Sequence, residues 1–499
     1  MRWQKKTINK ELTGAQDLYN FLFEACNIIR GPVSQDNFKD YITPLLYYKR
    51  ISDVYDEETE EALISSGGDK EYASLPEQHR FVIPDGCHWQ EVRERTENLG
   101  AAIVGAMRQI EIANPDTLYG VLSMFSSQKW TNKAILNDSK IRDLIEHLSK
   151  RKLGNKDYPA DLMGDAYEIL LKKFADDSKA QAGEFYTPRS VVRLLVHILD
   201  PQPGETVYDP ACGSGGMLIE AIRYMHDDSL CCGSIFGQEK NVVNAAIAKM
   251  NLFLHGASDF NVMQGDTLRD PKILQGGNIA KFDCVIANPP FSLENWGATE
   301  WSSDKYKRNI YGTPSDSCGD YAWIQHMICS MSSGKGRMAV VMPQGILFRG
   351  NQEAEIRKQL VESDLIEAVV TLGDKLFYGT GLSPCFLIIR RMKQAHHSGR
   401  ILMIDGSKIL TQKRAQNILE ENDIDRLYSL YQNYSDEEDY SRIVTLQEIR
   451  DKEYNLSPNR YVVYHKEEIR PYAEVLAEFK QAYADVKRLE NEFSLLINA

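Results

Sequence analysis

Four consecutive residues, Asn288, Pro289, Pro290 and Phe291, suit chemistry on a flat ring that carries an amine. The side-chain oxygen of Asn288 and the rigidly held backbone carbonyl of Pro289 can both accept hydrogen bonds from an amine. Two such acceptors would draw a ring-delocalised amine toward the tetrahedral geometry that it needs to attack a methyl sulfonium. Phe291 offers a face on which an extruded base can stack. The alternative is an incidental Pro-Pro loop after a strand.

A glycine-rich turn precedes these residues, between an expected strand and an expected helix. Its residues are Asp209, Pro210, Ala211, Cys212, Gly213, Ser214, Gly215, Gly216 and Met217. Glycines let a ligand approach the backbone closely, and a helix N-terminus offers free N–H groups. The turn alone indicates a nucleotide-like ligand, and a dinucleotide would fit as well.

Two carboxylates follow the next two expected strands. Glu239 lies about two dozen residues past the turn, where a ribose diol is usually bound. Asp266, which Thr267 follows, is placed to accept a hydrogen bond from the amino group of an adenine ring. A lone carboxylate is usually a solvated surface group. Because each of these two follows a strand of the same sheet, we expect both to bind a nucleoside cofactor.

A short upstream segment is expected to form a second edge of the cofactor site. Its residues are Gly183, Glu184, Phe185, Tyr186, Thr187, Pro188 and Arg189. Thr187 before Pro188 predicts a helix start, with the threonine as N-cap and the proline at the first helical position. By itself the segment is also compatible with a simple packed helix entry.

The elements that must position these residues alternate between strands and helices from about residue 161 onward. We expect strands at 206–209, 234–239, 261–265, 282–287, 337–342, 365–372 and 385–390. This alternation predicts an α/β fold with a doubly wound, mostly parallel sheet of seven strands, a Rossmann-like core. Ligands of such sheets bind at the carboxyl ends of the strands, which is where the motifs fall.

Residues 11–150 have the periodicity of helices. One apolar stripe with steps of three and four residues consists of Leu18, Phe21, Leu22, Ala25, Ile28 and Ile29. Further helices are expected at 89–113 and 139–152, an acidic surface loop at 56–68, and a joint between domains at 154–159.

The last segment, residues 467–499, carries an apolar seam with the spacing of a helix that faces another helix. The seam residues are Tyr472, Leu476, Phe479, Tyr483, Val486, Leu489, Phe493 and Leu496. Such a helix either packs back on its own domain or binds a partner chain.

Composition limits the class of protein. With 499 residues, 43% hydrophobic and 26% charged, the chain is expected to be a soluble protein of two or three domains. It has no apolar run long enough for a membrane span and no signal peptide, so we expect a cytoplasmic location. Nine cysteines without a C-x-x-C pair predict neither a metal site nor disulfides. The net charge of −13 indicates that any bound DNA is held mainly by another chain.

The motifs at 183–189, 209–217, Glu239, Asp266 and 288–291 together resemble those of the adenine-specific DNA methyltransferases. Across its full length the chain is similar to the modification (M) subunits of Type I restriction-modification systems. Segments similar to that family also lie at 41–53, 320–323, 376–381 and 455–461.

The resemblance implies a helical N-terminal domain (1–155), an S-adenosylmethionine-dependent methyltransferase domain (156–465) and a helical tail for partner contact (466–499). S-adenosylmethionine would be bound by the residues at 184–189, 209–211 and 213–216, and by Glu239, Asp266 and Thr267. Asn288, Pro289 and Phe291 would hold a flipped adenine of double-stranded DNA. The implied partners are a specificity (S) subunit that reads the DNA, a second M subunit and, in some assemblies, a restriction (R) subunit.

The stretch 292–317 contains Trp296, Trp301, Lys305, Tyr306, Lys307, Arg308 and Tyr311. Aromatic and basic residues suit unstacked bases and phosphates, so the stretch is either a mobile loop that closes over DNA or an ordinary surface excursion. If it closes over DNA, its deletion is expected to abolish methylation and spare cofactor affinity.

Two other functions fit part of the pattern. The Asn-Pro-Pro-aromatic set could methylate a glutamine amide of a partner protein, and a relict site could serve a subunit that only assembles or senses cofactor. The segment at 183–189 and the large helical domain favour DNA as the substrate. The intact residues 288–291 and glycine turn favour an active enzyme.

Overall fold

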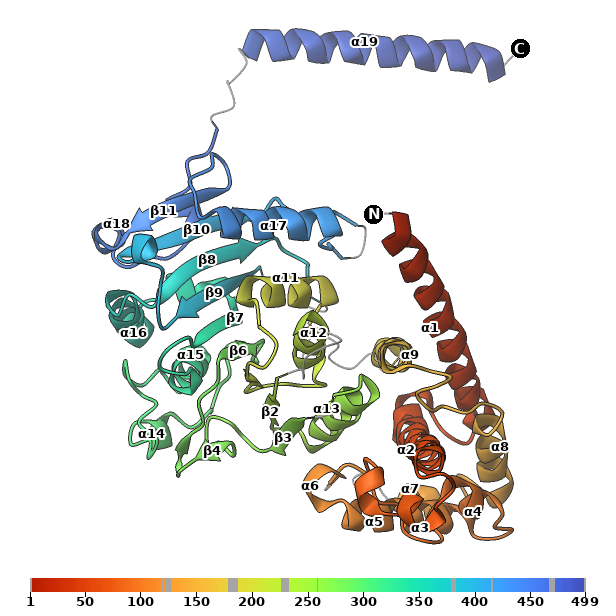
Figure 1. The fold of residues 1–499 in the computed structure, drawn as a ribbon. Coiled ribbons are helices and arrows are strands. Elements are labelled where there is room, and N and C mark those ends of the chain that lie inside the picture. The colour runs from red at the N-terminus through yellow and green to blue at the C-terminus, as the bar shows by residue number, and fades with distance from the viewer. Residues whose placement is uncertain are drawn as a thin grey trace.

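The computed structural model describes residues 2–118, 120–122, 127–177, 187–225, 233–257, 259–377, 383–413, 416–465 and 472–497. Figure 1 shows a group of helices from the N-terminal part of the chain beside a large twisted sheet, with a long C-terminal helix lying apart from both.

The N-terminal part is helical, as its periodicity predicts. Its helices are α1 (Arg2–Ile29), α2 (Phe38–Ser65), α3 (Lys70–Ala73), α4 (Trp89–Arg93), α5 (Leu99–Ala113), α6 (Pro115–Leu118), α7 (Ser127–Thr131), α8 (Asp138–Leu148) and α9 (Ala160–Asp177). The predicted stripe from Leu18 to Ile29 lies in their common core. Arg50 of α2 is buried and donates hydrogen bonds to the carbonyls of Leu153 and Tyr158, so the chain leaving the helices is anchored to their core.

Two local predictions in this part are wrong. The acidic stretch 56–68 is not a loop, because α2 continues to Ser65. Glu60 and Glu61 are exposed, whereas Glu57 accepts hydrogen bonds from the backbone N–H groups of residues 155 and 156. The helix expected at 89–113 is broken between α4 and α5. Asn98 adopts a left-handed conformation at the break (φ 53°), and Asp138 accepts hydrogen bonds from the backbone N–H groups of Asn98 and Leu99.

The sheet contains the seven expected strands and two more at one edge. Its strands are β1 (Val207–Asp209), β2 (Ile235–Glu239), β3 (Phe260–Gln264), β6 (Cys284–Ala287), β7 (Arg337–Pro343), β8 (Ile366–Leu372), β9 (Pro384–Arg390), β10 (Arg400–Gly406) and β11 (Ser441–Thr445). They lie in the order β11-β10-β8-β9-β7-β6-β1-β2-β3. β9 and β11 run antiparallel to their neighbours and the other pairs are parallel. The short β4 (Leu274–Gln275) and β5 (Asn278–Ile279) form a separate hairpin.

Helices cover both faces of the sheet, so its strands are apolar on both sides. One face packs on α11 (Arg189–Leu199), α12 (Gly216–Met225) and α17 (Glu421–Asn433). The other packs on α14 (Ala298–Trp301), α15 (Asp320–Ser330), α16 (Asn351–Glu362) and α18 (Leu446–Asp451). Successive residues alternate between these two cores: Cys284 and Ile286 of β6 enter the first, and Val285 and Ala287 enter the second.

Helix α13 (Val242–Leu254) joins the sheet to the N-terminal helices. Ala248 and Leu252 pack in a core of the sheet, while Met250 and Phe253 pack in the core of the helical part. The ring of Phe253 lies edge-on to Tyr47 of α2, with 5.1 Å between ring centroids. Helix α9 follows the expected joint at 154–159 yet packs with the N-terminal helices. The division of the chain at residue 155 therefore stays a prediction.

The C-terminal helix α19 (Tyr472–Ile497) is the helix expected from the seam. The apolar side chains that the structure describes along this helix are largely exposed to solvent. Those more than half exposed are Phe479, Tyr483, Val486, Leu489 and Phe493. Within the described residues, no helix combines the length and the apolar character that crossing a membrane requires.

Candidate active site

The sequence motifs meet at the carboxyl ends of β1, β2, β3 and β6. The chain runs outward from β1 through β2 to β3 and then returns to place β6 on the other side of β1. Such a reversal of strand order leaves a crevice above the strand ends, where open α/β sheets bind ligands. The glycine turn follows β1, Glu239 ends β2, Asp266 follows β3, and Asn288 follows β6.

The two ends of the Asn288 carboxamide differ in their surroundings. Its Nδ2 donates a hydrogen bond to Oγ1 of Thr187 at 2.9 Å. Its Oδ1 is buried and accepts no hydrogen bond from the part of the chain that the structure describes. A buried acceptor without a partner is costly, and such groups in native proteins usually have a functional reason.

Thr187 is therefore not the helix cap that the sequence predicts. Helix α11 begins at Arg189, and Pro188 occupies the N-cap position without a side-chain cap hydrogen bond. The hydroxyl of Thr187 is engaged with Asn288 instead of the helix N-terminus. Sequence reasoning placed Thr187 in the cofactor site and missed this contact, because nothing in the spacing links residue 187 to residue 288.

The remaining residues of the Asn-Pro-Pro-Phe set divide by exposure. Pro289 is buried and Pro290 is exposed. Phe291 is half-buried beside Phe377, with 6.4 Å between ring centroids and 54° between ring planes. Phe377 belongs to the family-like segment at 376–381, whose residues 378–381 lie outside the described part of the chain.

Two carboxylates accept hydrogen bonds from backbone N–H groups of the glycine turn. Asp209 is buried, accepts a hydrogen bond from the N–H of Ala211 at 2.9 Å, and has its pKa raised by burial to about 8. Glu239 accepts hydrogen bonds from the N–H groups of Gly213 (2.9 Å) and Asn241 (2.7 Å), and burial raises its pKa. These bonds fix the turn to the end of β2.

The turn has the backbone freedom and the space that a bound group requires. Gly213 (φ 54°) and Gly215 (φ 85°) are in the left-handed region. A Cβ atom added to Gly213 or Gly216 would meet no described atom within 4 Å. The carbonyl of Ser214 accepts a hydrogen bond from Asn251 of α13 at 3.1 Å, so this helix also holds the turn in place.

The two residues after β3 differ in their surroundings. Asp266 is partly exposed and pairs with Nζ of Lys240 at 2.8 Å. Thr267 is buried, and its hydroxyl donates to the carbonyl of Pro210 at 2.6 Å. Thr267 thus ties the loop after β3 to the glycine turn through the carbonyl of Pro210.

Only part of the upstream segment is described. Glu184, Phe185 and Tyr186 lie outside the described residues. The guanidinium of Arg189 lies 3.5 to 3.8 Å from carboxylate oxygens of α9 and α12, namely those of Asp165, Glu168 and Glu220.

The stretch 292–317 is packed onto the domain through its large side chains. Trp296, Trp301 and Arg308 are buried. Arg308 pairs with Asp304 and donates hydrogen bonds to the backbone carbonyls of residues 267 and 268. Three of the seven aromatic and basic residues expected to close over DNA are therefore buried in the domain, whereas Tyr306 and Tyr311 are partly buried and Lys305 and Lys307 are exposed.

Comparison with known proteins agrees with this architecture. Residues 158–469 match the family model described as N-6 DNA Methylase, and residues 18–148 match the HsdM N-terminal domain. The chain is 35% identical over 471 residues to the Type I restriction enzyme MjaVII methylase subunit of Methanocaldococcus jannaschii, covering 90% of this chain and 78% of that protein. It is 27% identical over 394 residues to the EcoKI methylase subunit of Escherichia coli, covering 75% of this chain and 67% of that protein.

Solved structures show the same fold. The Type I methyltransferase subunit from Streptococcus thermophilus superposes with a TM-score of 0.78 at 26% identity, covering 90% of this chain and all of that one. A modification subunit from Vibrio vulnificus gives a TM-score of 0.61 at 21% identity, covering 87% of this chain and 93% of that one. With its helical domain, its sheet and its Asn-Pro-Pro-Phe site, the chain belongs to the family of Type I restriction enzyme methylase subunits, which are N6-adenine DNA methyltransferases.

Proposed function

We propose that residues 288–291 hold an adenine extruded from double-stranded DNA and direct its exocyclic amine to a methyl donor bound at the glycine turn. The observation that carries this proposal is the carboxamide of Asn288, whose Oδ1 is buried without a hydrogen-bond partner among the described residues while its Nδ2 is bonded to Thr187. An acceptor held ready in this way fits the N–H group of an incoming amine.

The chemistry explains why an acceptor is needed. The lone pair of an adenine amine is delocalised into the ring, so the amine is a weak nucleophile. A hydrogen bond from the amine to Oδ1 of Asn288 favours the pyramidal form and stabilises the positive charge that develops on nitrogen during attack. The buried Pro289 supplies its backbone carbonyl as a second acceptor, fixed in place by the proline ring.

Phe291 would support the base from one side. Its ring is half-buried and lies beside the ring of Phe377, so the position of the Phe291 ring is fixed before a base binds. An extruded base loses its stacking in the duplex, and an aromatic face restores part of that energy, about 1 to 3 kcal/mol per base.

The family is one of S-adenosylmethionine-dependent methyltransferases, which implies use of that cofactor. When bound, S-adenosylmethionine supplies an electrophilic methyl group. The residues above the strand ends fit it: the space beside Gly213 and Gly216 admits a ligand, and Glu239 keeps lone pairs for a ribose diol. Lys240 forms an ion pair with the carboxylate of Asp266. For that carboxylate to bind the amino group of the cofactor's adenine, Lys240 must bind one oxygen only or move away. We assign the cofactor to residues 184–189, 209–211, 213–216, Glu239 and Asp266, with Thr267 as a support of the site.

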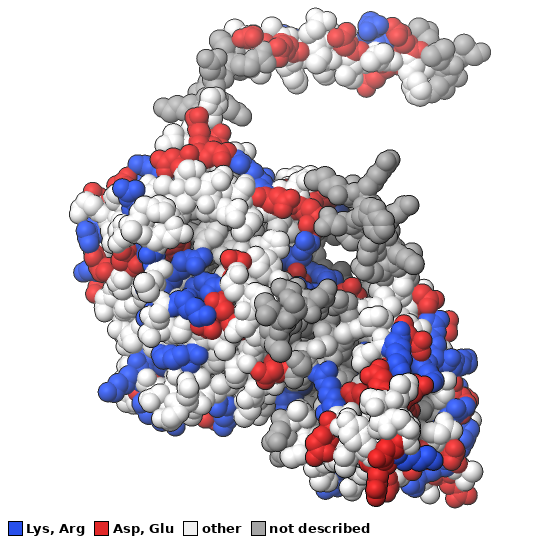
Figure 2. Space-filling model, in the orientation of Figure 1, with Lys and Arg blue, Asp and Glu red and all other residues white. Residues whose placement is uncertain are grey.

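The chain works in the assembly of a Type I restriction-modification system. We further propose that a specificity subunit supplies DNA sequence recognition, and that two M subunits act with it, joined in some assemblies by a restriction subunit. The net charge of −13 and the mixture of both signs on the face in Figure 2 favour a partner that carries part of the DNA contact. Helix α19, with its exposed apolar seam, is the segment best suited to hold that partner.

Methyl transfer from labelled S-adenosylmethionine to bacterial DNA tests the proposal, with and without the co-purified specificity subunit. We expect label in adenine with the wild-type complex and at least about 100-fold less with Asn288→Ala, while cofactor affinity measured by calorimetry stays within about twofold. Asn278→Ala, in the exposed β4–β5 hairpin, is the matched control and should retain full activity. Full transfer by Asn288→Ala would refute the assignment, and label in protein would point to the glutamine alternative.

A further inference from the structure

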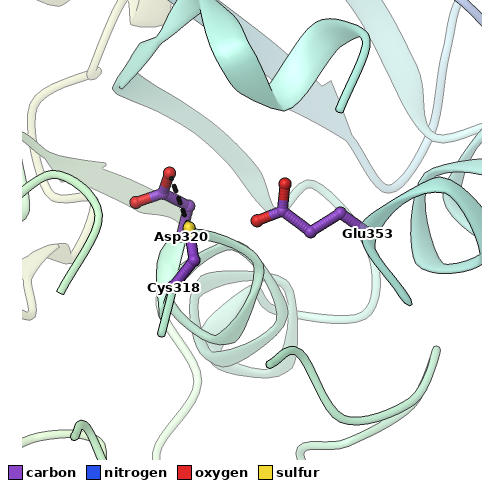
Figure 3. A group of neighbouring side chains, drawn as sticks. All are labelled: Cys318, Asp320 and Glu353. Carbon is purple, nitrogen blue, oxygen red and sulfur yellow. Dashed lines mark hydrogen bonds between the residues drawn. The ribbon is translucent and has the colours of Figure 1, made fainter. Parts of the chain in front are cut away.

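Three side chains with potential metal-ligand atoms gather beside the proposed base site, and an arginine lies among them. Figure 3 shows Cys318 and Asp320 at the start of α15, with the side chain of Glu353 reaching toward them from α16. Their donor atoms lie within 4.8 Å of one another. The positive charge among them is already supplied by Nη1 of Arg349, at 2.6 Å from Asp320, 3.0 Å from Cys318 and 3.5 Å from Glu353.

The cluster is connected to Ser292, the residue that follows Phe291. Asp320 is fully buried, and its Oδ1 accepts a hydrogen bond from the backbone N–H of Ser292 at 2.7 Å. Nη2 of Arg349 donates to Oγ of the same serine at 3.2 Å. Ser292 is therefore held by side chains from two different elements, through its backbone and through its hydroxyl.

Ser292 needs this support because its conformation is unfavourable. Its φ is 50°, in the left-handed region that residues with a Cβ atom rarely adopt. Holding a residue other than glycine there costs on the order of 1 to 2 kcal/mol. The turn at Ser292 sets the direction in which the chain leaves Phe291.

The surroundings of Arg349 are shaped to keep its guanidinium in place. A Cβ atom added to Gly345 would lie 2.4 Å from Nε of Arg349, so the glycine leaves room for that side chain. Nη1 of Arg357 donates to the backbone carbonyl of Arg349 at 2.7 Å. Hydrogen bonding to Asp320 raises the pKa of Arg349 despite its partial burial, and burial raises the pKa of Glu353.

We propose that Arg349 and Asp320 form a positioning pair that holds the strained turn at Ser292 and thereby fixes Phe291 for stacking on the extruded adenine. Neither residue is assigned contact with the base or the cofactor. The pair acts through Ser292, and the inference rests on the proposed role of residues 288–291.

The test uses Arg349→Lys in the complete complex with its specificity subunit. Lysine keeps the charge beside Asp320 but lacks the planar fork that reaches both Asp320 and Ser292. We expect kcat for DNA methylation to fall about 10- to 100-fold, because small misplacements of reacting groups have effects of this size. Cofactor affinity should stay within about twofold and the melting temperature should fall by no more than a few degrees. Arg450→Lys is the matched control, since Arg450 pairs with Glu362 on the surface, and it should have no effect.

A second substitution separates positioning from a general structural role. Glycine adopts positive φ without strain, so adding Ser292→Gly to Arg349→Lys should restore several-fold of the lost kcat. Unchanged kcat in Arg349→Lys, a loss that follows the melting temperature, or no recovery with Ser292→Gly would overturn the proposal. Asn288→Ala measured beside these variants separates the two claims, because its full activity would instead refute the proposed base site.

Discussion

Oγ1 of Thr187 lies 2.9 Å from Nδ2 of Asn288, so a residue of the segment before α11 determines which end of the asparagine amide faces the site. The two ends of an amide have opposite roles, since the oxygen accepts and the nitrogen donates. With the nitrogen bonded to Thr187, the oxygen is the end left for an incoming amine.

Removing the hydroxyl of Thr187 should therefore impair catalysis. Thr187→Val keeps the shape of the side chain but lets the Asn288 amide rotate, so we expect kcat to fall about 10- to 100-fold, equivalent to about 1.4 to 2.8 kcal/mol. Thr187→Ser keeps the hydroxyl and should restore most of the activity. Steady-state methylation kinetics and calorimetric cofactor binding provide the measurements. An equal loss of cofactor affinity would show instead that Thr187 acts mainly on the cofactor, as its sequence context predicts.

Asp209→Asn should stabilise the ligand-free protein at the upper end of the pH range. The carboxyl of Asp209 has a pKa of about 8 in the folded chain against 3.8 ordinarily, because burial disfavours its charged form. The unfolded chain ionises this group above about pH 4, so the free energy of unfolding of the wild type falls as pH rises from about 4 to 8. Asparagine cannot ionise, and we expect a gain of roughly 1 to 2 kcal/mol at pH 8.

Urea unfolding of Asp209→Asn and wild type at pH 5 and pH 8 measures this difference. The advantage of the variant should be small at pH 5 and grow toward pH 8. A difference that does not change with pH would contradict the assignment. Because the glycine turn is proposed to bind the cofactor, Asp209→Asn should also bind S-adenosylmethionine more weakly.

Glu205→Gln should destabilise the fold at neutral pH. Burial alone would raise the pKa of Glu205, but hydrogen bonds from Arg337 at 2.7 and 3.2 Å lower it to about 2. The stability that the carboxylate contributes is complete above its ordinary pKa of 4.5 and is lost as pH falls toward 2. Breaking this buried pair should cost on the order of 3 kcal/mol at pH 7.

Urea midpoints measured from pH 7 down to pH 3 test this expectation, because the gap between wild type and Glu205→Gln should narrow below about pH 4.5. Glu362→Gln is the control. Glu362 also pairs with an arginine, Arg450, but on the surface, so its loss should change stability clearly less. Equal effects of the two substitutions would contradict the role given to burial.

Replacing two seam residues of α19 should prevent assembly without unfolding the chain. Phe479→Asp with Leu489→Asp places charges on side chains that are more than half exposed, so the melting temperature should not change. Complex formation with the specificity subunit, measured by light scattering after gel filtration, should be lost. Gln481→Asp, also exposed on α19, is the control and should assemble normally. Undiminished assembly of the double variant would exclude the seam as the contact.

Strand β6, which Asn288 follows, and its neighbour β7 were predictable because their residues are buried and mostly apolar on both faces. Cys284–Ala287 and Arg337–Pro343 are wholly buried runs bounded by polar turns, a pattern that few other structures produce. The strands at one sheet edge were missed. Arg400–Gly406 and Ser441–Thr445 carry no chemical motif, and β11 has only five residues, part of them exposed.

The contacts within the site could not be predicted in the same way. Thr187 orients Asn288 only because α11 is placed against β6 in the fold. The two residues are 101 positions apart in the sequence. The acidic stretch 56–68 was misassigned for a simpler reason: a run of acidic residues resembles a loop when the helix preceding it is not known to continue. Long-range side-chain contacts leave no periodic signal in a sequence.

Helix α13 completes two hydrophobic cores at once, and neither core can be finished without it. A catalytic fragment cut free of the N-terminal helices would expose Ile247, Met250, Phe253 and Leu254 to water along one side of that helix. Such a fragment would be prone to aggregate. The two parts of the chain should accordingly denature in one cooperative transition, and truncation is a poor route to a smaller working enzyme.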